Sequence, residues 1–188
     1  MATPRVGRPP RLTLEEIVAA AMTMDPDTLT MQAVARWLRV APSALYRWVT
    51  DREHLLDLVS AELGARLGPT TQPTAATWRQ WLVDFAGELR AGLHEIPGFA
   101  VRLLTGPHRH QHPNPVEDAV LAAFELGGVP PELARQYWHV YSTAIIGWVV
   151  VEQNDRYPAD PALDFAVLVK VLVDGTAGTA GPEEHRAP

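Results

Sequence analysis

Hydrophobic residues recur three and four positions apart along most of the chain, a spacing that predicts amphipathic α-helices. Thr13 and Glu16 have the spacing of a capping box at the start of the first stripe. No segment alternates apolar and polar residues between hairpin turns, so strands are not expected. The pattern therefore predicts an all-α protein of about nine helices. The expected helices cover residues 13–24, 30–38, 42–49, 51–66, 78–96, 99–104, 116–126, 130–154 and 163–174.

Residues 30–52 have the layout of a helix-turn-helix followed by a further helix. Thr30 is a suitable N-cap for the first helix, and Val40 supplies the apolar residue that such a turn needs. Pro42 suits the first turn of the second helix, for which Ser43 is another possible cap. We expect three apolar residues of this second helix to face inward, namely Leu45, Trp48 and Val49.

The opposite side of this second helix carries small and polar groups. A short helix of this kind fits the major groove of DNA, because small residues allow close approach while phenol and guanidinium groups reach phosphates or guanine. This side is therefore the predicted DNA-reading surface. Its members are Ser43, Ala44, Tyr46 and Arg47.

The segment resembles the TetR-type transcriptional regulators over residues 13–63. The resemblance is carried by Leu29-Thr30, Val34-Ala35, Leu38, Val40, Ala44-Leu45-Tyr46, Val49 and Leu55-Leu56. By position, it implies that Gln32 and Ala44 contact bases and that Thr30 and Tyr46 contact phosphates. It also implies a phosphate contact for Arg52, where the family usually has a lysine.

The sequence departs from the family pattern at two places. Arg39 stands where the family usually has a turn glycine, so a positive φ there would carry a strain of about 1 kcal/mol. The segment between Ala21 and Thr30 is several residues shorter than is typical. Neither departure removes the predicted recognition helix.

The net charge of the chain is negative, but its N-terminal part has the basic charge that a DNA-binding protein needs. The 188 residues carry a net charge of −6 and no cysteine. Residues 1–52 hold seven arginines and five acidic residues, so the basic charge belongs to the predicted DNA-binding end. The chain shows neither a signal peptide nor a membrane span, which predicts a soluble cytoplasmic protein.

The sequence also suggests how the chain is divided. Residues 1–12 form a proline-rich basic arm whose Arg8 and Arg11 either enter a minor groove or belong to an inert terminus. The expected DNA-binding domain covers residues 13–66. A body for effector binding and dimerisation covers residues 74–174, and residues 175–188 have the composition of a tail.

Aromatic residues concentrate in the body, where they line either an effector cavity or an ordinary packed core. The family resemblance implies a pocket between the fourth and eighth helices, and we favour that interpretation. The partner would be a small hydrophobic or aromatic effector. The candidate pocket residues are Trp78, Trp81, Phe85, Phe99, Leu103, Phe124, Trp138 and His139.

Apolar character extends around more than one face of the penultimate helix, as expected if it contacts both the core and a second subunit. In the family, the last two long helices form the dimer interface. A fully buried core helix in a monomer is the alternative. The candidate interface residues are Tyr141, Ile145, Trp148, Val151, Val167 and Val171.

Three alternate histidines, His108, His110 and His112, are potential ligands for zinc, nickel or copper. They lie in a proline-flanked loop without the spacing of a dedicated site, so we expect neither a metal nor any other cofactor. No catalytic motif is present, and an enzyme is not expected.

These features predict a homodimeric transcriptional regulator, most simply a repressor that an effector releases from a palindromic double-stranded DNA operator. An activator is a variant of this prediction. The alternative from another class is a ligand-binding or protein-interaction module whose helix-turn-helix is not used on DNA.

Overall fold

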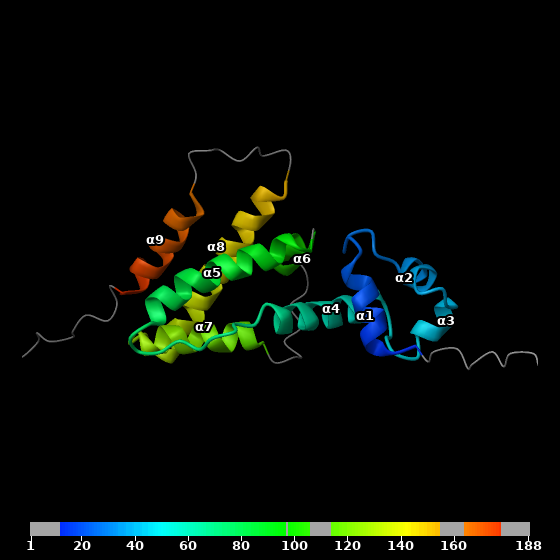
Figure 1. Cartoon of the computed structure of the whole chain (residues 1–188), viewed down its shortest axis with the longest axis horizontal. Helices are drawn as coiled ribbons and strands as arrows, with labels where there is room; N and C mark the ends of the chain where they lie inside the picture. The colour runs from blue at the N-terminus through cyan, green and yellow to red at the C-terminus, as the bar shows by residue number, and fades with distance from the viewer. Residues whose placement is uncertain (1–11, 97, 106–113, 155–163, 178–188) are drawn as a thin grey trace, which may run out of the picture. The chain divides into compact units, whose positions relative to one another are not determined.

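The computed structural model describes residues 12–96, 98–105, 114–154 and 164–177. Within these ranges every regular element is an α-helix, and there are nine of them (Figure 1). The predicted all-α class is therefore confirmed. In chain order the helices are α1 (Leu14–Met22), α2 (Met31–Trp37), α3 (Pro42–Leu45), α4 (Arg52–Arg66), α5 (Trp78–His94), α6 (Phe99–Thr105), α7 (Pro115–Leu126), α8 (Pro131–Glu152) and α9 (Phe165–Ala177).

The chain forms two compact units, Met1–Val59 and Ser60–Pro188. The division falls inside α4, whereas the sequence placed it in the loop after this helix. The first turns of α4 therefore belong to the N-terminal unit and its last turns to the body.

Three helices of the N-terminal unit begin with a side-chain cap, and those of α1 and α2 are the predicted ones. The Thr13 hydroxyl accepts the backbone N–H of Glu16, and the Glu16 carboxylate accepts the N–H of Thr13, which confirms the capping box. Thr30 caps α2 by accepting the N–H of Ala33 at 3.1 Å. Asp51 does the same for α4 by accepting the N–H of His54 at 2.8 Å.

The core of the N-terminal unit brings together apolar residues of all four helices. Its members include Ile17 and Ala21 of α1, Val34 and Ala35 of α2, Leu45 of α3 and Leu55, Leu56 and Val59 of α4, all of which are buried. The helical spacing of apolar residues therefore corresponds to the buried faces of α1, α2 and α4, whereas the stripe predicted for α3 is confirmed only at Leu45 and Val49.

The second helix of the helix-turn-helix is shorter than predicted. Leu45 and Val49 are buried, but the Trp48 side chain is 43% exposed, so its predicted inward position is wrong. The helix ends at Leu45, and the backbone N–H groups of Trp48 and Val49 both donate to the Leu45 carbonyl. After this turn Val49 is buried like Leu45, whereas Trp48 is exposed to solvent. The predicted cap is also wrong, because Ala41 is the N-cap of α3 and makes no side-chain cap bond.

The turn between α2 and α3 contains Arg39 at a φ of 56°, the left-handed region that favours glycine. The strain that the sequence suggested at this position is therefore present, at about 1 kcal/mol relative to glycine. The N–H of Val40 donates to the Ala35 carbonyl at 3.0 Å and closes the turn.

The body is built around α5 and α8, with α6, α7 and α9 packed against them (Figure 1). The Tyr141 hydroxyl of α8 donates to the Leu82 carbonyl of α5 at 2.6 Å, and burial raises the pKa of this tyrosine. The rings of Trp81 and Phe85 stack at 5.0 Å, while Phe124 meets Tyr141 edge-on.

α9 continues through Ala177, so residues 175–177 are helical and do not belong to the predicted tail. In the described part of the chain, no helix is both long and apolar enough to span a membrane.

Candidate DNA-binding surface

The candidate recognition surface is formed by α3 and the turn that follows it. Leu45 and Val49 are completely buried beneath it, whereas Ser43 and Arg47 are exposed and Tyr46 is 55% exposed. Ala44 is half-buried between them. The four predicted front-face residues therefore lie on the outer side of the helix-turn-helix.

The start of α2 contributes two further groups. Gln32 is exposed in the first turn of this helix, with its amide available to solvent. The Thr30 hydroxyl uses one oxygen lone pair for the N-cap and keeps its proton for another acceptor. Both groups can donate hydrogen bonds to DNA without breaking the cap.

Arg52 of α4, which the family resemblance assigns to a phosphate, binds the protein's own backbone. Its Nε donates to the Leu29 carbonyl at 2.9 Å, its Nη2 donates to the Pro26 carbonyl, and its Nη1 pairs with Glu53 at 2.6 Å. The side chain remains 36% exposed. Arg52 therefore fastens the segment between α1 and α2 to the start of α4.

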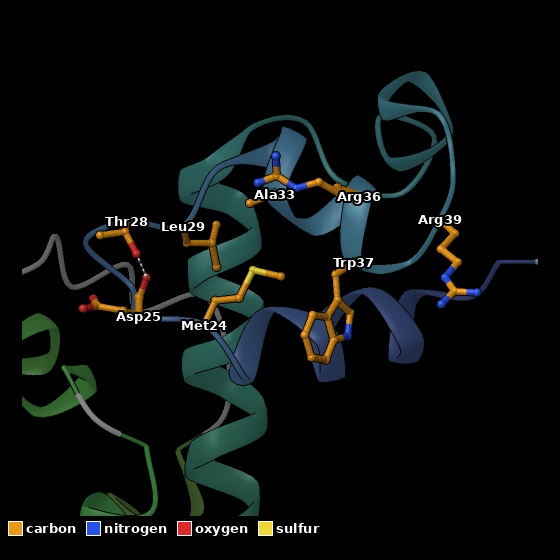
Figure 2. A pocket seen from close by; sticks show the side chains of 8 residues that line it. All are labelled: Met24, Asp25, Thr28, Leu29, Ala33, Arg36, Trp37 and Arg39. Carbon is orange, nitrogen blue, oxygen red and sulfur yellow. Dashed lines mark hydrogen bonds between the residues drawn. The ribbon is translucent and has the colours of Figure 1, made fainter.

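A hollow of about 630 Å³ lies beside α2 in the N-terminal unit (Figure 2). The side chain of Trp37 is 62% exposed at this hollow. Figure 2 shows the guanidinium groups of Arg36 and Arg39 pointing in different directions, away from each other. Sequence reasoning missed this hollow, whose lining residues all fall between positions 24 and 39. The lining residues are Met24, Asp25, Thr28, Leu29, Ala33, Arg36, Trp37 and Arg39.

The candidate effector-pocket residues divide into a packed and a more open group. Five of them are buried core residues, namely Trp78, Trp81, Phe85, Phe99 and Phe124. Leu103 and Trp138 are half-buried, and His139 is exposed. A shallow hollow of about 350 Å³ in the body is lined by residues of α5 and α9, none of which is among these eight.

The candidate interface residues on α8 and α9 divide in the same way. Tyr141 and Ile145 are buried in the core of the protomer, which places them away from any surface offered to a second chain. Trp148 is half-buried and donates its Nε1–H to Glu152 at 2.7 Å. The exposed members are Val151, Val167 and Val171.

Exposed Val140, which the sequence analysis missed, extends this apolar surface. Val140, Ala144, Gly147 and Val151 follow one another at spacings of four, three and four, so they form a single stripe along α8. The helical period could have identified the stripe from sequence. It was overlooked because the bulkier Tyr141 and Ile145 dominated the pattern.

A charged cluster joins the C-terminal parts of α5 and α8. The Glu152 carboxylate accepts hydrogen bonds from Arg90, His94 and Trp148, the shortest of which is 2.6 Å. Partial burial raises the pKa of Glu152, but these hydrogen bonds outweigh it and lower the pKa to about 2. The Arg90 guanidinium also lies 5.1 Å from the centre of the Phe165 ring of α9.

Several predicted residues fall outside the described ranges. They are Arg8 and Arg11 of the arm and His108, His110 and His112 of the loop. Among the described residues, no group of three or more histidine, cysteine, aspartate or glutamate side chains is arranged to hold a metal ion.

The described chain thus combines a helix-turn-helix unit with a separate helical body, which defines the class of helix-turn-helix proteins with an all-helical second domain. No protein-family model matches the sequence. No curated protein matches it either.

Solved structures, among them members of the TetR family, share the fold over about 90% of the chain. ActR from Streptomyces coelicolor in complex with actinorhodin has a TM-score of 0.77 and 22% sequence identity, covering 91% of this chain and 99% of ActR. BioQ from Mycobacterium smegmatis has a TM-score of 0.75 and 26% identity, covering 90% of this chain and 100% of BioQ. A TetR variant from Acinetobacter baumannii AYE in complex with minocycline has a TM-score of 0.75 and 22% identity, covering 91% of this chain and 99% of the TetR chain.

The resemblance to TetR-type regulators that the sequence indicated for residues 13–63 therefore extends over about 90% of the chain and includes the body.

Proposed function

We propose that this protein is a homodimeric transcriptional repressor that leaves a palindromic operator when a small hydrophobic or aromatic effector binds its body. The observation that carries the proposal is the outer side of α3, where Ser43, Tyr46 and Arg47 are exposed above the buried Leu45 and Val49. BioQ, which shares the fold at 25% identity, has been solved with its double-stranded DNA operator, and this likeness supports the assignment.

The contacts with DNA divide by chemistry. Gln32 and Ala44 are proposed to meet base edges, since an amide can pair with adenine and a methyl group can lie against thymine. Thr30, Tyr46 and Arg52 are proposed to hold phosphates and so fix the position of the helix-turn-helix on the duplex. Ser43 and Arg47, on the same side of α3, complete the proposed surface.

Dimerisation through α8 and α9 is supported by the exposed apolar stripe. Val167 and Val171 of α9 are 59% and 64% exposed, and they lie one helical turn apart. A Cβ atom added at Gly147 of α8 or at Gly175 of α9 would meet no atom within 4 Å, so a second backbone could approach closely there. A two-fold dimer would place two α3 helices for half-sites roughly 34 to 36 Å apart.

The effector site is proposed within the aromatic core of the body. ActR and TetR have been solved with actinorhodin and minocycline, which supports a ligand site in this fold. An effector would have to separate helices to reach this core, because its five candidate aromatic residues are buried, namely Trp78, Trp81, Phe85, Phe99 and Phe124. The half-buried Leu103 and Trp138 and the exposed His139 would form the entrance.

α4 is the element proposed to couple the two sites. Its first residue, Arg52, holds the Leu29 carbonyl in the N-terminal unit. Just beyond its last turn, Leu67 packs so closely on α5 that a Cβ at Gly92 would lie 2.0 Å from its Cδ2. A movement of α5 would therefore displace the end of α4. If an effector weakens DNA binding a hundredfold, about 2.7 kcal/mol, DNA must weaken effector binding equally.

A direct test is fluorescence anisotropy of the full-length protein with a random-sequence 30-base-pair duplex at low salt. We expect weak binding that falls modestly as salt is added, because neutralised phosphates release counterions and residues 1–52 carry only seven arginines against five acidic residues. A folded protein that binds no duplex even at low salt would contradict the proposal and favour a module that does not use its helix-turn-helix on DNA.

A further inference from the structure

Arg39 adopts a backbone conformation that its side chain makes unfavourable. Its φ of 56° is the one positive value among the non-glycine residues that the structure describes. Glycine would adopt this conformation without the clash of a Cβ atom. Strain kept at one position in this way calls for a compensating role of the side chain.

The compensation does not come from the described protein itself. The Arg39 side chain is exposed and makes no hydrogen bond or ion pair with any described residue. It lines the open hollow beside α2, and in Figure 2 its guanidinium points away from that of Arg36. Its charge is therefore available to a partner.

Arg39 lies close to α3 along the chain. It lies three residues before Pro42, the first residue of α3, and three residues span at most about 10 Å. Residues 12–59 contain four arginines, and Arg52 is already bound to the Leu29 and Pro26 carbonyls. Arg39 and Arg47 are the two that flank α3 without a described partner.

We propose that Arg39 is an additional DNA contact, which pairs with a backbone phosphate beside the bases read by α3. This inference rests on the proposed DNA-binding function and adds to it a contact that the usual turn glycine cannot make. A guanidinium binds a phosphate through charge-assisted hydrogen bonds, whatever the neighbouring base. The contact would therefore strengthen binding to all sequences alike.

The test compares Arg39→Gly with the wild type on a duplex enriched from a random DNA library. Relief of the backbone strain should raise the Tm by about 2 to 4 °C. Loss of one phosphate contact per protomer should make the slope of log affinity against log salt shallower by about 1.8 for a dimer. Operator and scrambled duplex should lose affinity by the same factor.

Two variants serve as controls. Arg39→Lys keeps the charge and should retain most of the wild-type salt slope. Arg135→Ala removes an equal charge from an exposed position on α8 and should leave the slope unchanged.

The possible failures are distinguishable. If the wild type enriches no duplex from the library and binds none, the proposed function fails and this inference fails with it. If the wild type binds an enriched duplex and Arg39→Gly keeps the same salt slope, only the role of Arg39 is overturned. A fall in Tm for Arg39→Gly would contradict the premise that the positive φ of Arg39 destabilises the folded protein.

Discussion

At the scale of single residues, the side chains of the N-terminal unit have separable roles. Leu45 and Val49 hold α3 on the core, and Thr30 closes the start of α2. Gln32 and Tyr46 are exposed and have no comparable structural task. Substitutions at these two positions can therefore report on DNA binding without unfolding the domain.

Gln32→Ala and Tyr46→Phe should have different effects on DNA binding. Gln32→Ala should lose a base contact and so relax the preference for one base at one operator position by about 1 to 3 kcal/mol. A lost phosphate contact from the Tyr46 hydroxyl should weaken all sequences similarly. Binding to a set of single-base operator variants measures both, and a uniform loss for Gln32→Ala would contradict its assignment as a base reader.

Arg52→Ala should affect stability as well as affinity. Its guanidinium satisfies the Leu29 and Pro26 carbonyls, so its removal should destabilise the N-terminal unit by about 1 to 2 kcal/mol in addition to weakening DNA binding. Thermal unfolding followed by circular dichroism measures the first effect. Arg47→Ala is the matched control, and an equal Tm for the two variants would contradict the fastening role of Arg52.

At the scale of helices, most of the fold could be predicted because its signals are local. The capping box at Thr13 and Glu16 and the stripes of α4 and α5 depend on residues three or four positions apart. Trp48 could not be placed in this way, because the point at which α3 ends determines its orientation. The partners of Arg52 lie 23 and 26 residues away, beyond any sequence period.

The Glu152 cluster is another feature that local patterns do not encode, since it joins α5 and α8 across about 60 residues. The pKa of Glu152 is about 2 in the folded state, below its ordinary value of 4.5. A lowered folded-state pKa contributes stability that is complete above the ordinary pKa and is lost as the pH falls toward the folded one.

Glu152→Gln should therefore flatten the dependence of stability on pH between about 4.5 and 2. At pH 7 the substitution should cost about 1 to 2 kcal/mol, a value reduced for the solvent exposure of Arg90 and His94. Urea unfolding at a series of pH values measures both effects. Wild type and variant with parallel pH profiles would contradict the stabilising role of the cluster.

At the scale of the whole molecule, the proposed function depends on two copies of the chain. A single α3 of four residues offers few base contacts, and a two-fold pair doubles them. The surface assigned to this pairing is the apolar stripe of α8, in which Val140 and Val151 are exposed and Ala144 and Gly147 half-buried, together with the exposed Val167 and Val171 of α9.

Val171→Glu should convert the dimer into a folded monomer, because it would place a charge in an apolar interface. Sedimentation equilibrium measures the mass, and circular dichroism checks that the helices remain. Val101→Glu on α6, at a similarly apolar but separate exposed site, should leave the mass unchanged. A dimer that persists in Val171→Glu would place the interface elsewhere.

The most direct test of the account is the selection of binders from a random double-stranded DNA library by the purified full-length protein at low salt, followed by sequencing. The account predicts a palindrome whose half-sites lie about one helical turn apart. An Ala44→Glu variant selected in parallel should fail to enrich that palindrome, because a carboxylate on α3 would repel phosphates. A folded, dimeric wild-type protein that enriches no motif would contradict the claim that this helix-turn-helix reads DNA.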